Sequence, residues 1–420
     1  MTEEGRGTAQ LVGTALEGLT FDAIYSSPLQ RAQETAQVIH SCLPNSPTPQ
    51  VHDKLMEIDL PLWAGMLRQD VKDKFPDDYR TWQEHPDQFS MTIPSEEGVA
   101  IAYFPVLSIF ESAQQFWQEI LPHHEGKTIL IVAHNGINRA LLGTAIGIAP
   151  AYYHSIQQSN CGVSVLNFTP TKEDNKYSLQ LESMNLTSHV GEKFPTLREN
   201  HQGTRILFVR HGETEWNRQQ RFQGQIDVPL NDNGRVQASK AAEFLKDVTI
   251  DFAVSSPMLR PKETAQIILN YHPNVELQFH EGLCEISHGL WEGKFEREIE
   301  ESFPGMLEEW KNFPETVQMP EGENLQQVWE RAIETWQSII KSSKPGSVGL
   351  VVAHDAINKA ILCHLFGLPP ENFWNFKQGN GAVTVIDYPK GLDGLPVLQA
   401  MNITTHLSGG ILDKTAAGAL

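Results

Sequence analysis

Short, continuously apolar stretches alternate with amphipathic stretches along the second half of the chain. The apolar stretches predict buried strands at 205–210, 251–257 and 348–355. Between and after them, the amphipathic stretches predict three helices, at 231–247, 260–269 and 357–367. Buried strands that alternate with helices are typical of an α/β domain, a mostly parallel sheet covered on both faces.

Two further apolar stretches, at 381–388 and 396–406, predict late strands near an edge of this sheet. In folds of this kind ligands bind at the carboxyl ends of the strands. The residues that directly follow each apolar stretch are therefore the first candidates for a functional site.

The same pattern occurs a second time, earlier in the chain, which indicates an internal repeat. Four blocks recur in the same order, so the chain contains two copies of one domain, at 1–190 and 204–408, with the polar segment 190–203 as linker. The blocks pair Ser26 with Ser255, Glu57 with Glu285, His134 with His354, and the stretch "LESMNLTSH" with "LQAMNITTH".

The first copy lacks the passage with which the second copy begins. Met1 corresponds to Leu230, so residues 205–229, which contain "RILFVRHGETEWN", have no counterpart. Three interpretations follow: the natural chain begins further upstream, which we favour; the first copy is a degenerate module kept for binding or regulation; or it borrows a strand from a partner chain. The fold expected is two tandem three-layer α/β/α domains, the first without its opening central strand.

Composition and net charge argue against some classes of partner and indicate a cellular compartment. The chain has 420 residues, 40% of them hydrophobic, and a net charge of -20, which argues against nucleic acid or an anionic membrane as partner. Four scattered cysteines, an N-terminus unlike a signal peptide and the lack of a long apolar run predict a cytoplasmic protein without a membrane span. The oligomeric state is left open.

Basic residues and histidines follow three of the predicted strands. Arg210 and His211 follow the first, Arg260 lies shortly after the second, and His354 follows the third. A lone histidine after a strand is most simply structural, but two histidines and two arginines at neighbouring strand ends indicate one site. Guanidinium groups do not ligate metals and match phosphate oxygens in pairs, so the pattern favours a phosphoryl group over a metal ion.

The motifs "RHGETEWN", "QGQIDVPLNDNGRVQA", "SSPMLRPKETA", "EISHGLWEG" and "VVAHD" resemble those of the histidine phosphatase (phosphoglycerate mutase-like) superfamily. The resemblance implies that His211 is the nucleophile and that Glu285 donates a proton to the leaving oxygen. It further implies phosphate and substrate contacts, without metal or other cofactor, from the following residues: Arg210, Asn217, Gln223, Gly224, Arg260 and His354.

The first copy keeps Arg31, Glu57 and His134 but has no counterpart of Arg210 and His211. It therefore has no nucleophile. A further departure from the family is Asp355, which stands where many relatives have glycine and places an acid beside the expected phosphate site.

The segment after Glu285 distinguishes two activities of the family. Mutases carry a long insertion with basic residues there, whereas residues 295–313 form an acidic, aromatic run that resembles phosphatases. The tandem layout is similar to that of 2-carboxy-D-arabinitol-1-phosphatase-like proteins, which implies hydrolysis of a small phosphorylated sugar or sugar acid. The alternatives are a cofactor-dependent phosphoglycerate mutase and a regulatory protein that binds phosphometabolites.

Overall fold

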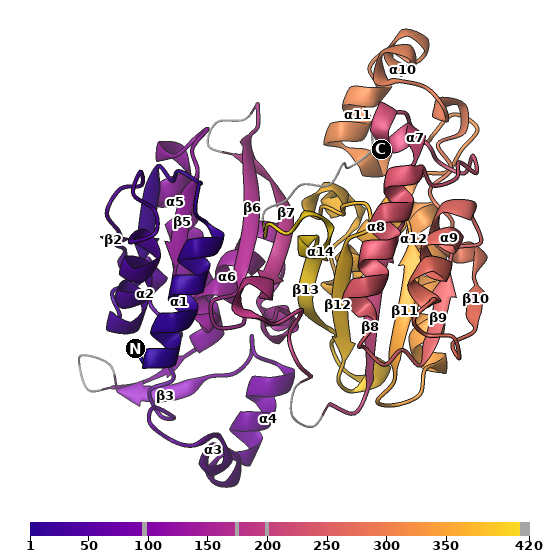
Figure 1. The fold of residues 1–420 in the computed structure, drawn as a ribbon. Coiled ribbons are helices and arrows are strands. Elements are labelled where there is room, and N and C mark those ends of the chain that lie inside the picture. Colours follow the sequence, from indigo (N-terminus) through magenta and orange to yellow (C-terminus); the bar gives the residue numbers. More distant parts are fainter. Residues whose placement is uncertain (95–98, 173–175, 198–200, 412–420) are drawn as a thin grey trace. The chain divides into compact units, whose positions relative to one another are not determined.

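The computed structural model describes residues 1–94, 99–172, 176–197 and 201–411 and divides into two compact units (Figure 1). Residues 198–200 of the predicted linker lie outside the described residues. Unit 1 comprises 1–162 with two short later segments, and unit 2 comprises most of the remainder. Each unit is described by itself.

The RHG passage forms the central strand of unit 2. Strand β8 (Thr204–Arg210) is buried along its whole length and lies between β11 (Val348–Ala353) and β12 (Val383–Tyr388). It runs parallel to β11 and antiparallel to β12. On the far side of β11, β9 (Phe252–Ser255) and β10 (Leu277–Phe279) continue the parallel part. The mostly parallel sheet predicted from the apolar pattern is confirmed.

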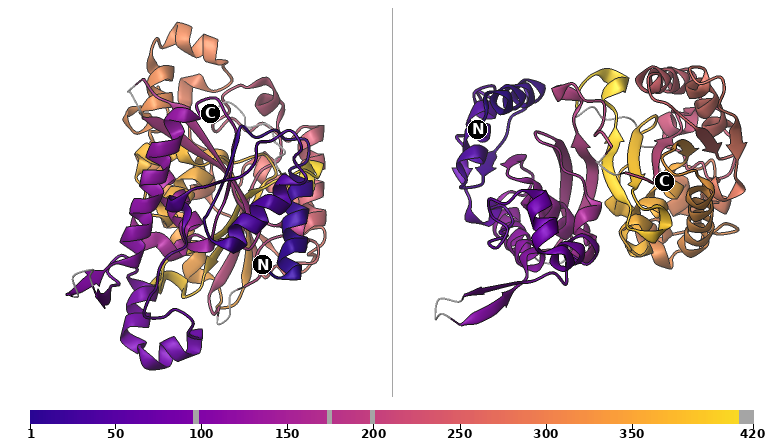
Figure 2. Two further views of the ribbon diagram at one scale, coloured as in Figure 1. Left: turned by 90° about the vertical axis from the view of Figure 1, so that its left-hand side faces the viewer. Right: turned by 90° about the horizontal axis from the view of Figure 1, so that it is seen from below.

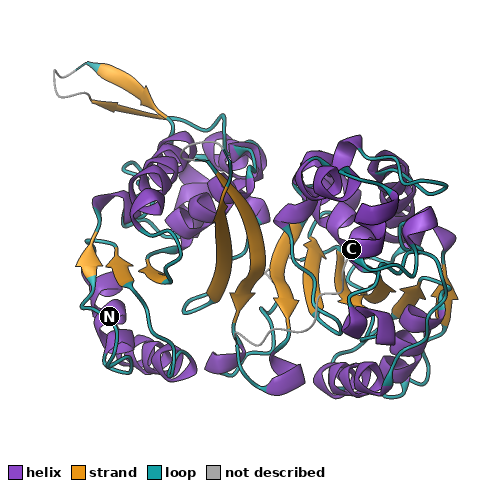
Figure 3. Ribbon diagram, turned by 90° about the horizontal axis from the view of Figure 1, so that it is seen from above, coloured by secondary structure: helices purple, strands orange, loops and turns teal. Residues whose placement is uncertain are grey.

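Helices cover both faces of this sheet, as the hydrophobic pattern predicts (Figures 2 and 3). Helices α8 (Asp232–Leu245) and α9 (Leu259–Leu269) pack together on one face, and α12 (Leu325–Ser342) and α13 (Asp355–Leu365) on the other. Unit 2 also contains α7 (Glu215–Gln219), α10 (Glu296–Ser302), α11 (Met306–Asn312) and α14 (Thr405–Ser408).

The late strands do not form an edge of the sheet, contrary to the expectation from the sequence. Strand β13 (Val397–Ile403) pairs with β12 on one side and with β7 (Tyr177–Leu186) on the other, where Met401 lies opposite Met184. Strand β6 (Val163–Pro170) then ends the eight-stranded sheet. Strands β6 and β7 belong to the first copy by sequence, yet most of this hairpin falls in unit 2.

The contact between β7 and β13 has local two-fold symmetry. The side-chain amide of Asn185 donates to the carbonyl of Gln399 at 2.7 Å, and that of Asn402 donates to the carbonyl of Glu182 at 2.6 Å. Asn185 and Asn402 occupy matching positions in the repeated stretch and both adopt positive φ, 53° and 55°. The two copies therefore contribute equivalent residues to this contact.

Unit 1 has a three-stranded parallel sheet in which β1 (Ala23–Ser26) lies between β2 (Gln50–Val51) and β5 (Ile129–Val132). Strands β1 and β5 correspond to β9 and β11, and among the described residues no strand occupies the place of β8, as predicted. In unit 2, β8 links β11 to β12.

Unit 1 begins with helix α1 (Glu3–Ala15), with Thr2 as its N-cap. The other elements of unit 1 are α2 (Gln30–His40), α3 (Arg68–Lys74), α4 (Pro76–Glu84), α5 (Pro105–Ile120), α6 (Asn135–Ile146), β3 (Met91–Pro94) and β4 (Ala100–Tyr103).

Candidate active site

The carboxyl ends of β8, β9 and β11 bring four predicted residues together. Arg210, His211, Arg260 and His354 are each at most 2% exposed. The rings of His211 and His354 lie 5.2 Å apart between centroids. Adjacent parallel strands end at one rim of the sheet, which is why residues about 140 positions apart in the chain meet here.

Hydrogen bonds assign the tautomer of His211. Its Nδ1 lies 2.7 Å from the carbonyl of Gly212, and its Nε2 lies 3.3 Å from Nε of Arg260. A carbonyl only accepts and a guanidinium only donates, so Nδ1 carries the proton and Nε2 keeps its lone pair. Burial, together with Arg260 and Arg210, holds the pKa of His211 well below its ordinary value, so the ring is neutral at pH 7.

Arg260 is anchored by the backbone of the loop that follows α7. Its Nη2 donates to the carbonyl of Gly224 at 2.8 Å and its Nη1 to that of Ile226 at 3.2 Å. Burial lowers the pKa of Arg260 to about 10, which still leaves the guanidinium charged at neutral pH. Gly224 has a φ of +56°, and a Cβ there would lie 2.2 Å from a carboxylate oxygen of Glu292, so glycine is required.

Two buried donors at the site have no hydrogen-bond partner among the described residues, Nε of Arg210 and Nδ1 of His354. The other nitrogen of His354 contacts the hydroxyl of Ser256 at 2.9 Å. Native proteins rarely leave buried polar atoms unpaired, so such atoms indicate where a polar ligand binds. The two donors suit the oxygens of a phosphoryl group.

Glu285 is 4% exposed, and its Oε1 accepts from the backbone N–H groups of Ile286 and Ala356 at 3.0 and 3.2 Å. Burial, and secondly the charge of Asp355, raises the pKa of the Glu285 carboxyl. Among the apolar residues close to Glu285 in the chain, Leu283, Ile286 and Trp291 are fully buried, whereas Leu290 is 44% exposed.

Asn217 and Gln223 are buried beside the site, but Asn217 is also structural. It forms a capping box with Thr214 at the start of α7, and its Oδ1 accepts from the side-chain amide of Asn380 at 3.3 Å. That amide also donates to the carbonyl of His211 at 3.1 Å. The side-chain oxygens of Gln223 and Asn380 are buried and have no partner among the described residues. Sequence reasoning missed Asn380, which no motif marked.

Arg210 belongs to a network of buried ion pairs. Asp355 contacts Nη1 of Arg210 at 3.2 Å and Nζ of Lys359 at 2.7 Å, and Lys359 lies 4.4 Å from the ring centroid of Trp374. The same Nη1 donates to the carbonyl of Gln378 at 2.6 Å. Asp355, noted in the sequence only as a departure from the family, is thus the ion-pair partner of Arg210.

We expect Asp355→Asn to move the basic limb of the pH–activity profile to lower pH. The charge of Asp355 raises the pKa of Glu285, so its removal lowers that pKa. A proton donor is active below its pKa, and activity is then lost at lower pH than in the unchanged protein. The position of the limb, measured on kcat, is the test. Asn135→Asp, at the matching position of the first copy, serves as control; an unmoved limb in Asp355→Asn would contradict the expectation.

No group of three or more histidine, cysteine or carboxylate side chains suited to a metal ion occurs among the described residues. Within the same ranges, no helix combines the length and apolar character that crossing a membrane requires.

The corresponding residues of the first copy pair with one another. Nε of Arg31 donates to Nδ1 of His134 at 3.1 Å, the atom that is free in His354. The side chain of Asn135 donates at 2.7 Å to the carbonyl of Gln158, which corresponds to Gln378, the acceptor for Arg210. The ring nitrogen that has no partner in His354 is therefore occupied internally in His134 of unit 1.

Comparisons with known proteins show the family to which the chain belongs. Residues 1–178 and 206–404 match the family described as "Histidine phosphatase superfamily (branch 1)". The chain is 29% identical to the 2-carboxy-D-arabinitol-1-phosphatase of Triticum aestivum, over 97% of this chain and 81% of that protein. It is 28% identical to a probable 2-carboxy-D-arabinitol-1-phosphatase of Arabidopsis thaliana, over 97% and 82%. Phosphoserine phosphatase 1 of Hydrogenobacter thermophilus is 32% identical, over 48% of this chain and 94% of that protein.

Proposed function

The chain belongs to the histidine phosphatase superfamily and is a phosphatase, and we propose that it hydrolyses the phosphomonoester of a small sugar or sugar acid through a phosphohistidine at His211. The observation that carries the proposal is the tautomer of His211. A neutral ring whose unprotonated Nε2 lies 3.3 Å from Nε of Arg260 is a nucleophile positioned beside an anion site.

In the first step, Nε2 of His211 attacks phosphorus, and the bond to the ester oxygen breaks. That oxygen takes the proton of Glu285, so the alcohol leaves neutral and Glu285 becomes a carboxylate. Arg210, Arg260 and His354 donate to the phosphoryl oxygens and offset the charge that develops on them.

In the second step, a water molecule attacks the phosphorus of the phosphohistidine. The carboxylate of Glu285 takes a proton from this water, the nitrogen–phosphorus bond breaks, and its electron pair returns to Nε2. Inorganic phosphate leaves, and both His211 and Glu285 regain their starting protonation states.

A sugar or sugar-acid substrate is supported by the site and by the relatives. The unpaired side-chain oxygens of Gln223 and Asn380 can accept from substrate hydroxyls. The wheat and Arabidopsis relatives, which align over 97% of the chain, carry the name of an enzyme for 2-carboxy-D-arabinitol 1-phosphate. We propose this ester, or a related sugar phosphate, as the substrate. We also propose that the protein acts in the cytoplasm.

A panel of phosphomonoesters tests the substrate class. With the full chain, kcat/KM should be highest for a phosphorylated sugar acid or a sugar phosphate, with phosphoserine and 3-phosphoglycerate as comparison compounds. Conversion of 3-phosphoglycerate to 2-phosphoglycerate should be negligible beside phosphate release. A mutase activity that dominates once a bisphosphate is added would overturn the assignment to hydrolysis.

Chelation tests whether side chains carry out catalysis without a metal ion. Phosphate release should persist in EDTA, because arginine and histidine donors take the place of a metal at the phosphoryl oxygens. Activity that is lost with EDTA and restored by a divalent ion would contradict this expectation.

The pairing of Arg31 with His134 bears on the regulatory alternative. A phosphometabolite that binds the first copy would have to break this contact. If the first copy binds no phosphometabolite, Arg31→Ala should leave kcat and KM for the substrate unchanged. A changed KM would favour the regulatory function.

A further inference from the structure

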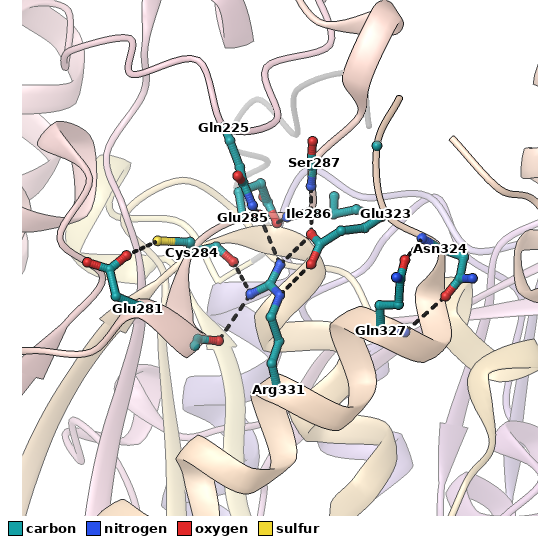
Figure 4. Close-up of polar contacts among 12 residues, drawn as sticks. Gln225, Glu281, Cys284, Glu285, Ile286, Ser287, Glu323, Asn324, Gln327 and Arg331 are labelled. Carbon is teal, nitrogen blue, oxygen red and sulfur yellow. Dashed lines mark hydrogen bonds and ion pairs between the residues drawn. The ribbon is translucent and has the colours of Figure 1, made fainter. Parts of the chain in front are cut away.

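The side chain of Arg331, on the second turn of α12, binds the backbone of the loop that carries Glu285 (Figure 4). Nη1 of Arg331 donates to the carbonyls of Cys284 at 2.6 Å and Gly282 at 3.1 Å, and Nη2 donates to the carbonyl of Glu285 at 3.0 Å. One side chain thus binds three carbonyls of a single short loop.

Glu323 completes this arrangement, which we call the Arg331–Glu323 clasp. The carboxylate of Glu323 accepts from Nε and Nη2 of Arg331 at 2.7 and 2.8 Å. Its Oε2 also accepts from the backbone N–H of Ser287 at 2.8 Å, and its own N–H donates to the carbonyl of Ser287 at 2.9 Å (Figure 4). All five N–H donors of the guanidinium are thereby used.

The clasp acts on the backbone on either side of Glu285. The carbonyl of Cys284 belongs to the peptide group before the Cα of Glu285, and the carbonyl of Glu285 belongs to the peptide group after it. A peptide group is planar, so holding both groups restricts φ and ψ at Glu285 and, with them, the direction of its Cα–Cβ bond. A proton donor has to lie within hydrogen-bond reach of the leaving oxygen, and small displacements are costly.

The first copy shows that the fold does not need the clasp. Alignment of "FESAQQFWQEI" with "WERAIETWQSI" places Ser112 at the position of Arg331. Helix α5 nevertheless packs on the turn Asp53–Leu55, as α12 packs on Glu281–Leu283. The first copy thus lacks the clasp but keeps the packing.

A second set of contacts near Glu285, made by Glu292, is also absent from the first copy. Glu292 accepts from the N–H groups of Gln225 and His288, at 2.9 and 3.1 Å, and so links the loop after Gly224 to the segment that follows Glu285. In the first copy, Ala64 stands at its position, between the matching "LW" and "G". The clasp and the contacts of Glu292 are thus both absent from the first copy.

We infer that Arg331, together with Glu323, is a positioning residue for hydrolysis: it holds the backbone on both sides of Glu285 so that the carboxyl group stays in reach of the ester oxygen and then of the attacking water. The inference rests on the proposed function, because it requires Glu285 to be the proton donor. It predicts a loss confined to the steps that need this proton.

The test compares two substrates in the full-length protein. Arg331→Met should lower kcat about 10- to 100-fold for a sugar phosphate, whose leaving group needs protonation, with KM nearly unchanged. Release of p-nitrophenol in the first turnover of p-nitrophenyl phosphate, whose leaving group needs little protonation, should change little, because this step precedes the attack of water. Arg331→Lys, which keeps the charge but binds fewer carbonyls, should fall between. The matched control is Arg235→Met, which breaks the partly exposed pair with Glu263 (2.7 Å) on the same unit and should leave both substrates unaffected.

A double-mutant cycle with Glu285→Gln decides whether Arg331 acts through Glu285. Adding Arg331→Met to Glu285→Gln should cause little further loss on the sugar phosphate. Additive losses, equal losses on both substrates, or no loss at all would overturn the positioning role while leaving the proposed function intact. If Glu285→Gln alone fails to distinguish the two substrates, the proton-donor assignment fails and the positioning role with it. Should Arg331→Met not fold, Glu323→Gln carries the same test, because it removes the charged partner and keeps the guanidinium.

Discussion

His211→Ala should lower kcat by about 10⁴-fold or more on every phosphomonoester, activated or not. The substitution removes the unprotonated ring nitrogen Nε2, which lies 3.3 Å from Nε of Arg260, so no phosphohistidine can form. Phosphate release from a sugar phosphate and from p-nitrophenyl phosphate measures the loss. Rapid acid-free quenching with labelled substrate should trap labelled phosphate on the unchanged protein and none on the variant.

The first copy supplies the control. His134→Ala removes a buried histidine that corresponds to His354, in a copy with no counterpart of His211. Its turnover should equal that of the unchanged protein. If His134→Ala lost activity and His211→Ala retained it, catalysis would take place in the first copy, which would contradict the proposal.

Glu285→Gln should lower kcat about 10²- to 10⁴-fold for a sugar phosphate, the range that general acid catalysis contributes. Glutamine keeps the size of the side chain and an oxygen for the N–H groups of Ile286 and Ala356, so the loop should be preserved. It has no acidic proton for the leaving oxygen. The loss should be much smaller for the release of p-nitrophenol in the first turnover of p-nitrophenyl phosphate, and the basic limb of the kcat profile for the sugar phosphate should disappear.

Glu57→Gln is the matched control in the first copy, because Oε1 of Glu57 accepts from Ile58 and Ile137 in the same manner as that of Glu285. It should leave both substrates unaffected. An equal loss on both substrates in Glu285→Gln would show that this carboxyl has another role.

These experiments are best done on the full chain, because the hairpin of β6 and β7 is part of the sheet of unit 2. A fragment that starts near residue 200 would remove this hairpin and leave the outer edge of β13 unpaired. Unpaired strand edges expose backbone donors and acceptors and promote aggregation. Low activity of such a fragment would therefore say little about the site.

The sequence by itself determined the elements, the repeat and the residues at the strand ends. Strand and helix periodicity is a local property, and β8, β9 and β11 lie where the apolar pattern predicted them. Once these strands were predicted to be parallel neighbours, the meeting of His211, Arg260 and His354 followed from the geometry of a sheet. The missing strand of the first copy was likewise visible from the repeat alone.

Only the tertiary structure decided which groups those residues contact. The ion pair of Asp355 with Arg210, the reach of Arg331 to three carbonyls and the pairing of β7 with β13 join residues from different elements. Such contacts depend on side-chain direction, on burial and on which strand edge is free, and none of these is encoded in a local pattern. Burial is also what raises the pKa of Glu285 and lowers that of His211, so the protonation states on which hydrolysis depends are a product of the folded chain.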